Sequence, residues 1–73
     1  MKILLNSNLY TEKSIKKAIL SFESEGLADI DYSKEKDVHS IVLSNIDKSF
    51  ESIIKEEFCN FVLFEEVSQM QGS

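Results

Sequence analysis

Hydrophobic positions repeat at helical spacing in two parts of the chain and alternate with polar positions in three shorter parts. The first helical pattern follows Thr11, a favourable N-cap residue, and stops before Gly26, which suits the left-handed end of a helix. Its apolar positions are Ile15, Ala18, Ile19 and Phe22. The spacing therefore predicts a helix that Thr11 begins and Gly26 terminates.

The second helical pattern covers residues 50–70, after a capping residue at Asp47 or Ser49. Its predicted inner stripe contains Phe50, Ile53, Ile54, Phe58, Phe61 and Val62. The run from residue 58 to residue 64 is apolar on nearly every side, whereas a surface helix needs one apolar stripe. A chain of 73 residues has little core to surround such a helix, so we expect the excess apolar surface to contact another protein.

Three short segments have the pattern of strands: residues 2–6, 28–32 and 38–43. With the two helices they give the order β-α-β-β-α and an α+β fold. This order predicts a three-stranded antiparallel sheet with two helices on one face, a ferredoxin-like unit that lacks its last strand. Residues 38–43 would be the central strand, and Leu4 and Val42 would point to the open face. The missing strand would leave residues 2–6 with an uncovered edge, which could accept a strand from a peptide or a second copy.

The length of the chain predicts one small domain over residues 1–73, with a frayed tail at 69–73. A core of this size supplies only a few kcal/mol of net stability, and small folds often use disulfides, metals or oligomerisation as support. The chain has one cysteine and one histidine, so an internal disulfide is excluded and no zinc motif is recognisable. A homo-oligomer or a partner protein is the expected support.

The charge balance argues against a nucleic-acid-binding protein. Thirteen acidic residues against eight basic ones give a formal charge of −5, and nucleic-acid binding needs clustered positive charge. Only three apolar residues follow Met1 and Lys2 before Asn6, which is too few for a signal peptide, and no apolar run approaches membrane-spanning length. The cytoplasm is therefore the expected location, with no membrane partner.

No set of residues in the sequence matches a catalytic, cofactor-binding or metal-binding motif. Cys59 lies in an apolar run without basic neighbours and is expected to be a small buried hydrophobe. His39 alternates in register with Ile41 and Leu43, so we expect it at the rim of the core. The sequence predicts a protein that is not an enzyme and has no cofactor.

Two segments resemble a known family. Residues 8–18 (NLYTEKSIKKA), leading to Phe22, resemble the opening pattern L-Y-S-x-E-A-I-x-K-A…F of the small D-type proteins of His-Xaa-Ser repeat peptide modification systems. Residues 54–65 (IKEEFCNFVLFE) are similar to that family's segment EEFLNEVLDQELR. Phe61 and Phe64 replace polar residues of the family pattern and make this helix more apolar.

The resemblance implies a non-catalytic accessory protein in peptide natural-product maturation, which brings a precursor peptide and a modifying radical SAM enzyme together. A structural or regulatory homodimer formed through the second helix is one alternative, and a small acidic inhibitor of a basic surface, of the kind phages encode, is another. Either the second helix or the edge at residues 2–6 could be the recognition surface. The expected partner-binding residues are Phe58, Phe61, Val62, Phe64, Leu4 and Val42.

Overall fold

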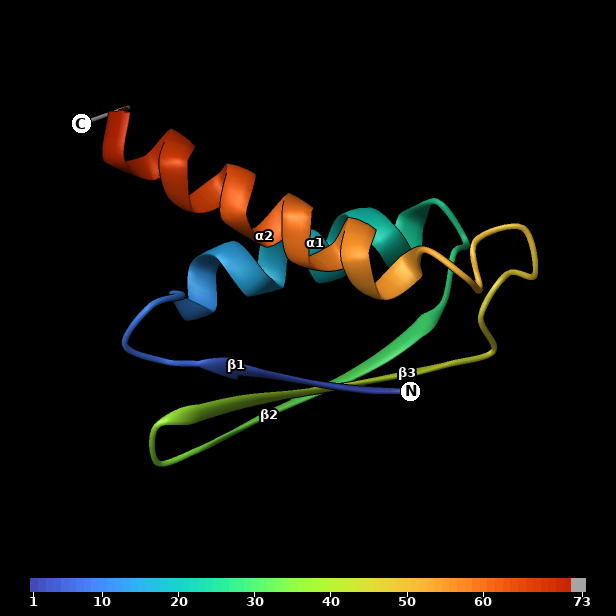
Figure 1. The fold of residues 1–73 in the computed structure, drawn as a ribbon, viewed down its shortest axis with the longest axis horizontal. Helices are drawn as coiled ribbons and strands as arrows, with labels where there is room; N and C mark the ends of the chain where they lie inside the picture. The colour runs from blue at the N-terminus through green and yellow to red at the C-terminus, as the bar shows by residue number, and fades with distance from the viewer. Residues whose placement is uncertain (72–73) are drawn as a thin grey trace.

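The computed structural model describes residues 1–71 and has the predicted α+β architecture (Figure 1). A three-stranded antiparallel sheet forms one layer, and both helices lie against the same face of it. The predicted order of elements is confirmed. The elements are β1 (Lys2–Asn6), α1 (Glu12–Ser24), β2 (Asp29–Glu35), β3 (Val38–Ser44) and α2 (Ile54–Gln71).

The central strand of the sheet is β3, as its apolar character predicts, and the strand order is β1-β3-β2. Ile41 pairs with Ile3 on one side and with Tyr32 on the other. Alternate residues of β3 point to opposite faces, so Ile41 is buried under the helices while its neighbour Val42 is 38% exposed. Leu4 is also exposed on the open face, where the sequence pattern predicts it.

Local signals define both ends of α1. The Thr11 hydroxyl accepts a hydrogen bond from the Ser14 backbone N–H at 3.2 Å, which satisfies one of the free donors of the first turn. At the other end, the N–H of Leu27 bonds to the carbonyl of Phe22 and the N–H of Gly26 to that of Glu23, both at 3.0 Å. This pair of bonds is the Schellman arrangement, with Gly26 in the left-handed conformation at φ +71°.

The second helix begins and ends later than the sequence pattern predicts. Residues 48–53 form successive turns before the helix, because the Asp47 carboxylate accepts from the Ser49 N–H and the Asp47 carbonyl accepts from Phe50. The helix starts at Ile54 and continues through Gln71. Of the predicted frayed tail, residues 69–71 are therefore helical here, and residues 72–73 lie outside the described part of the chain.

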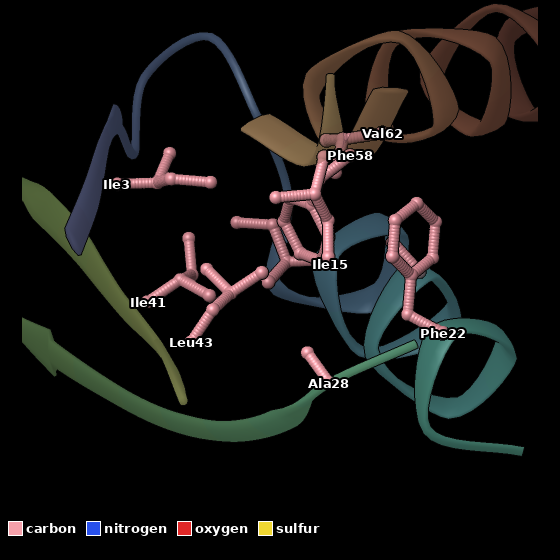
Figure 2. Close-up of a cluster of buried hydrophobic side chains, with 10 residues drawn as sticks. Ile3, Ile15, Phe22, Ala28, Ile41, Leu43, Phe58 and Val62 are labelled. Atoms are coloured by element: carbon pink, nitrogen blue, oxygen red, sulfur yellow. The ribbon is translucent and has the colours of Figure 1, made fainter. Parts of the chain in front are cut away.

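The core fills the space between the sheet and the two helices (Figure 2). Phe58 of α2 is fully buried at its centre and meets the ring of Phe22 edge-on, with centroids 5.2 Å apart. The Phe61 ring is also perpendicular to that of Phe22, with centroids 6.0 Å apart. The buried hydrophobic residues are Ile3, Ile15, Ala18, Phe22, Ala28, Ile41, Leu43, Ile54, Phe58 and Val62.

Candidate functional site: the outer face of the second helix

The C-terminal half of α2 exposes a group of large apolar side chains. Leu63, Val67 and Met70 follow one another at helical spacing, and Phe64 lies beside them. Their exposed fractions are 52% for Leu63, 65% for Phe64, 44% for Val67 and 77% for Met70. We call these four residues the α2 outer stripe. A continuous exposed apolar surface of this kind is typical of a protein interaction site.

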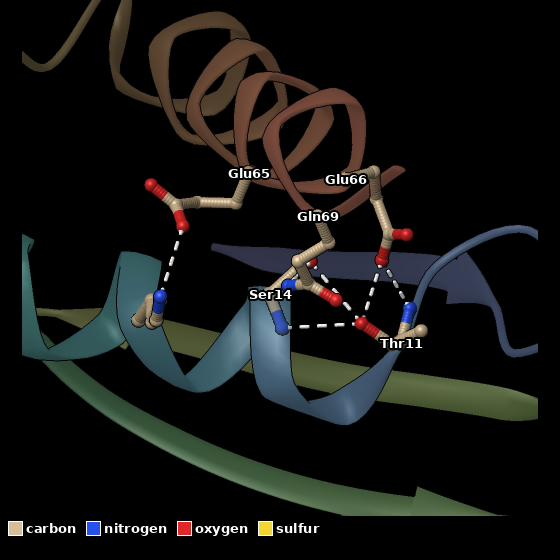
Figure 3. A network of polar contacts seen from close by, with 6 residues as sticks. Thr11, Ser14, Glu65, Glu66 and Gln69 are labelled. Atoms are coloured by element: carbon tan, nitrogen blue, oxygen red, sulfur yellow. Dashed lines mark hydrogen bonds and ion pairs between the residues drawn. The ribbon is translucent and has the colours of Figure 1, made fainter. Parts of the chain in front are cut away.

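The opposite side of the same helical segment is polar and faces α1 (Figure 3). The Glu65 carboxylate lies 3.6 Å from the Lys17 ammonium, and the Gln69 amide donates to the Ser14 hydroxyl at 2.7 Å. Glu66 accepts from both the backbone N–H and the hydroxyl of Thr11. The usual arrangement, with apolar residues facing inward, is therefore reversed in this half of α2.

The bonds to Glu66 also cap α1. Burial acts to raise the pKa of Glu66, but the hydrogen bonds from Thr11 and Ser14 more than offset it and hold the pKa below its ordinary value of 4.5. A carboxylate is also favourable at this place because the N-terminus of α1 carries the positive end of the helix dipole. Ser14 is fully buried with its hydroxyl bonded.

These polar contacts determine which way the α2 outer stripe faces. Turning Leu63 or Val67 toward α1 would pull Glu66 and Gln69 away from Thr11 and Ser14. It would remove the Gln69 bond from the fully buried Ser14 hydroxyl and leave only the contact with the Thr11 hydroxyl at 3.1 Å, and a lost hydrogen bond typically costs about 0.5–1.5 kcal/mol. The apolar residues are therefore held on the outside, and the exposure is built into the packing of the two helices.

The structure separates the predicted partner-binding residues into four groups. Phe58 and Val62 are fully buried in the core, so their expected role at a surface is wrong. They occupy the positions of α2 that face the sheet, and the domain needs them to fill its interior. Phe61 is half-buried against Phe22. Phe64 is exposed and belongs to the α2 outer stripe.

Leu4 and Val42, the other two predicted residues, lie together on the open face of the sheet, away from α2. The prediction missed Leu63, Val67 and Met70. Their spacing of four and three residues was visible in the sequence, and it would have identified them once the inner side of α2 was known.

The surroundings of Cys59 disfavour its reactive form, and the ring of His39 is held by hydrogen bonds. Burial raises the pKa of the Cys59 thiol, and the charge of Lys55 offsets only part of this, so the reactive thiolate is disfavoured. His39 is 1% exposed and lies deeper than the predicted rim position. Its Nε2 lies 2.8 Å from the Tyr10 carbonyl and its Nδ1 lies 2.8 Å from the Tyr32 hydroxyl, so both ring nitrogens are engaged.

In the described residues 1–71, no three side chains of His, Cys, Asp or Glu gather so that they could hold a metal ion. Neither of the two described helices combines the length and apolarity needed to cross a bilayer. Comparison with family models, curated proteins and solved structures finds no match to this chain.

Proposed function

We propose that this chain is a non-catalytic accessory protein that binds a partner protein through the α2 outer stripe. In the setting implied by the family resemblance, the partner is a radical SAM maturase, and the complex brings this enzyme and its precursor peptide together. The observation that supports binding is the reversed polarity of α2. Polar residues face α1, while Leu63, Phe64, Val67 and Met70 face outward.

The surroundings of the stripe describe the partner surface that would fit it. Glu56 and Asn60 extend the line of Leu63 and Val67 toward the start of α2, and both are exposed. The whole chain carries a formal charge of −5. A complementary surface would therefore be an apolar groove with a basic rim at the end that meets Glu56.

The test first asks whether a radical SAM enzyme is encoded beside this gene, and then measures its binding to this protein by co-purification and calorimetry. Phe64→Glu would place a charge in a dry interface and should weaken binding by at least about tenfold, equivalent to about 1.4 kcal/mol. The matched control is Leu20→Glu on α1, because Leu20 is 68% exposed and Phe64 is 65% exposed. Binding that survives Phe64→Glu but is lost with Leu20→Glu would contradict the assignment to α2.

The same variants separate this proposal from the homodimer alternative. A gene neighbourhood without a radical SAM enzyme, together with self-association that Phe64→Glu abolishes, would favour a homodimer formed through α2. A phage neighbourhood and tight binding to a basic protein surface would favour the acidic inhibitor.

A further inference from the structure

The outer edge of β1 presents unpaired backbone groups, and the hydrogen bonds to β3 identify which residues hold them. Met1 and Leu43 exchange two bonds, at 3.0 and 2.8 Å, and the Ser7 N–H donates to the Asp37 carbonyl at 2.8 Å. In an antiparallel pair the bonded residues alternate along the strand. Ile3 and Leu5 therefore direct their backbone groups toward β3, and Lys2, Leu4 and Asn6 direct theirs away from the sheet.

The other edge of the sheet, at β2, is partly closed. The same alternation directs the backbone groups of Ile30, Tyr32 and Lys34 outward. There the Glu23 carboxylate of α1 accepts from the Ile30 N–H at 3.2 Å. On β1, the Asn6 carbonyl accepts hydrogen bonds from the N–H groups of Leu9 and Tyr10. Among the described residues, no partner bonds to the backbone N–H and C=O groups of Lys2 and Leu4. The β1 edge is thus the more open of the two.

We propose that two copies of this chain pair through their β1 edges, antiparallel and centred on Leu4, so that one sheet continues through both copies. The proposal is independent of the partner assigned to the α2 outer stripe. It depends on the strand itself, whose sequence KILLN has apolar residues around its centre and polar residues at its ends.

The antiparallel register matches both the backbone groups and the side chains. Leu4 would lie opposite Leu4 of the second copy, and the outward N–H and C=O groups of each would bond to the other. Lys2 would lie opposite Asn6, so the two lysines never meet. Ile3 would lie opposite Leu5, and Leu5 is half-buried at the edge of the core in one copy alone. Apolar cross-strand pairs of this kind stabilise a sheet.

The charges at the Asn6 end of the sheet are compatible with the same orientation. Asn6 pairs with Val38, which pairs with Glu35, and Asp37 bonds to Ser7, so two acidic residues lie at the Asn6 end of the sheet. A shallow hollow of about 610 Å³ lies there on the open face, and its lining residues are Lys2, Leu4, Glu35, Lys36, Asp37, Val38 and Ser40. Antiparallel pairing would bring the Lys2 ammonium of the second copy to this end. Lys36 and Lys2 of the same copy also line the hollow, so its two acids and two lysines carry no net formal charge, and the orientation depends mainly on the register.

Two proline variants test the proposal with opposite expected effects. The Leu4 N–H points outward, so Leu4→Pro should leave the sheet intact and weaken dimerisation by at least about tenfold, as expected for an edge strand that loses a donor. The Leu5 N–H points to β3, so Leu5→Pro should damage the fold. Sedimentation equilibrium gives the dimer dissociation constant, and circular dichroism reports whether each variant is folded.

A charge pair supplies a second, milder test. Lys2→Glu should weaken the dimer because it places a carboxylate beside Glu35 and Asp37 of the other copy. Lys55→Glu makes the same charge change at an exposed position of α2 and should leave the dissociation constant unchanged. Amide exchange of the unmodified protein adds a direct readout, since the Leu4 amide should exchange more slowly as protein concentration rises.

Three results would overturn the proposal. A monomer at millimolar concentration with rapid Leu4 exchange would exclude self-pairing. A dimer that Phe64→Glu dissociates and Leu4→Pro leaves intact would place the contact on α2. Protection of the Leu4 amide that appears only after a precursor peptide is added would assign the edge to that peptide strand.

Discussion

Gly26 ends α1 with a φ of +71°, a conformation that a residue with a β-carbon adopts only under strain. Apart from Gly26 and its two chain neighbours, no heavy atom lies within 4 Å of the place where a β-carbon would stand, so packing does not require glycine there. The requirement comes from the backbone alone. This single residue sets the direction in which the chain leaves α1 and enters β2.

We therefore expect Gly26→Val to lower the free energy of unfolding by about 1 kcal/mol or more, because a β-branched side chain strains the left-handed conformation. Gly26→Asn should cost clearly less, since asparagine tolerates this region. Urea denaturation of the two variants and the parent protein provides the measurement. Equal urea midpoints for the Gly26→Val variant and the parent protein would show that this backbone conformation is not required.

At the scale of the elements, α1 and α2 run antiparallel, so the N-terminus of α1 lies beside the C-terminal half of α2 (Figures 1 and 3). This arrangement explains charges that are unfavourable within each helix. Lys17 lies in the first half of α1 and Glu65 in the last half of α2, each against its own helix dipole, but across the interface they form an ion pair. The Lys17 side chain is half exposed and the distance is 3.6 Å, so this ion pair contributes little, and the hydrogen-bonded Glu66 contributes more.

Glu66→Gln should destabilise the fold by about 1 kcal/mol at pH 7, because it replaces charge-assisted hydrogen bonds from Thr11 with weaker neutral ones. The folded pKa of Glu66 lies below 4.5, so its stabilising effect is fully present above that pH and disappears as the pH falls through the folded pKa. The difference between parent and variant should therefore shrink from pH 7 to pH 3 in thermal unfolding experiments.

The control for this experiment is Asp31→Asn, which removes an exposed carboxylate from β2, away from either helix end. It should have little effect at either pH. A Glu66→Gln penalty that stays constant down to pH 3 would show that the charge of Glu66 is not what stabilises the contact.

At the scale of the whole molecule, one small core supports both layers. Phe58 contacts the centre of that core and is fully buried, while Phe61 covers its outer side. A domain of this size has only a few kcal/mol of net stability. The free energy lost when one central aromatic side chain is removed is therefore comparable to the net stability of the entire fold.

Phe58→Ala should cost about 3–5 kcal/mol and leave the isolated chain largely unfolded. Phe61→Ala should cost less, because the half-buried site is open to solvent and leaves a smaller cavity. Circular dichroism and denaturant titration distinguish the two outcomes. If Phe58→Ala still unfolded cooperatively, with a denaturant midpoint near that of the parent protein, the central position of this residue would be contradicted.

Local patterns in the sequence determined the order of the elements, the ends of α1 and the two faces of the sheet. These features depend on near neighbours: the alternation around Ile41 and Val42, the cap at Thr11 and the left-handed residue at Gly26. Each signal lies within a few residues of the structure that it specifies, so sequence reasoning could identify it.

Tertiary packing alone decided which side of α2 is buried, because apolar residues surround that helix and its own period is ambiguous. The sheet selected Phe58 and Val62 for the core, the polar contacts to Thr11 and Ser14 held Leu63 and Val67 outside, and Asp47 delayed the start of the helix. These outcomes depend on contacts between residues far apart in the chain, and no local pattern records such contacts.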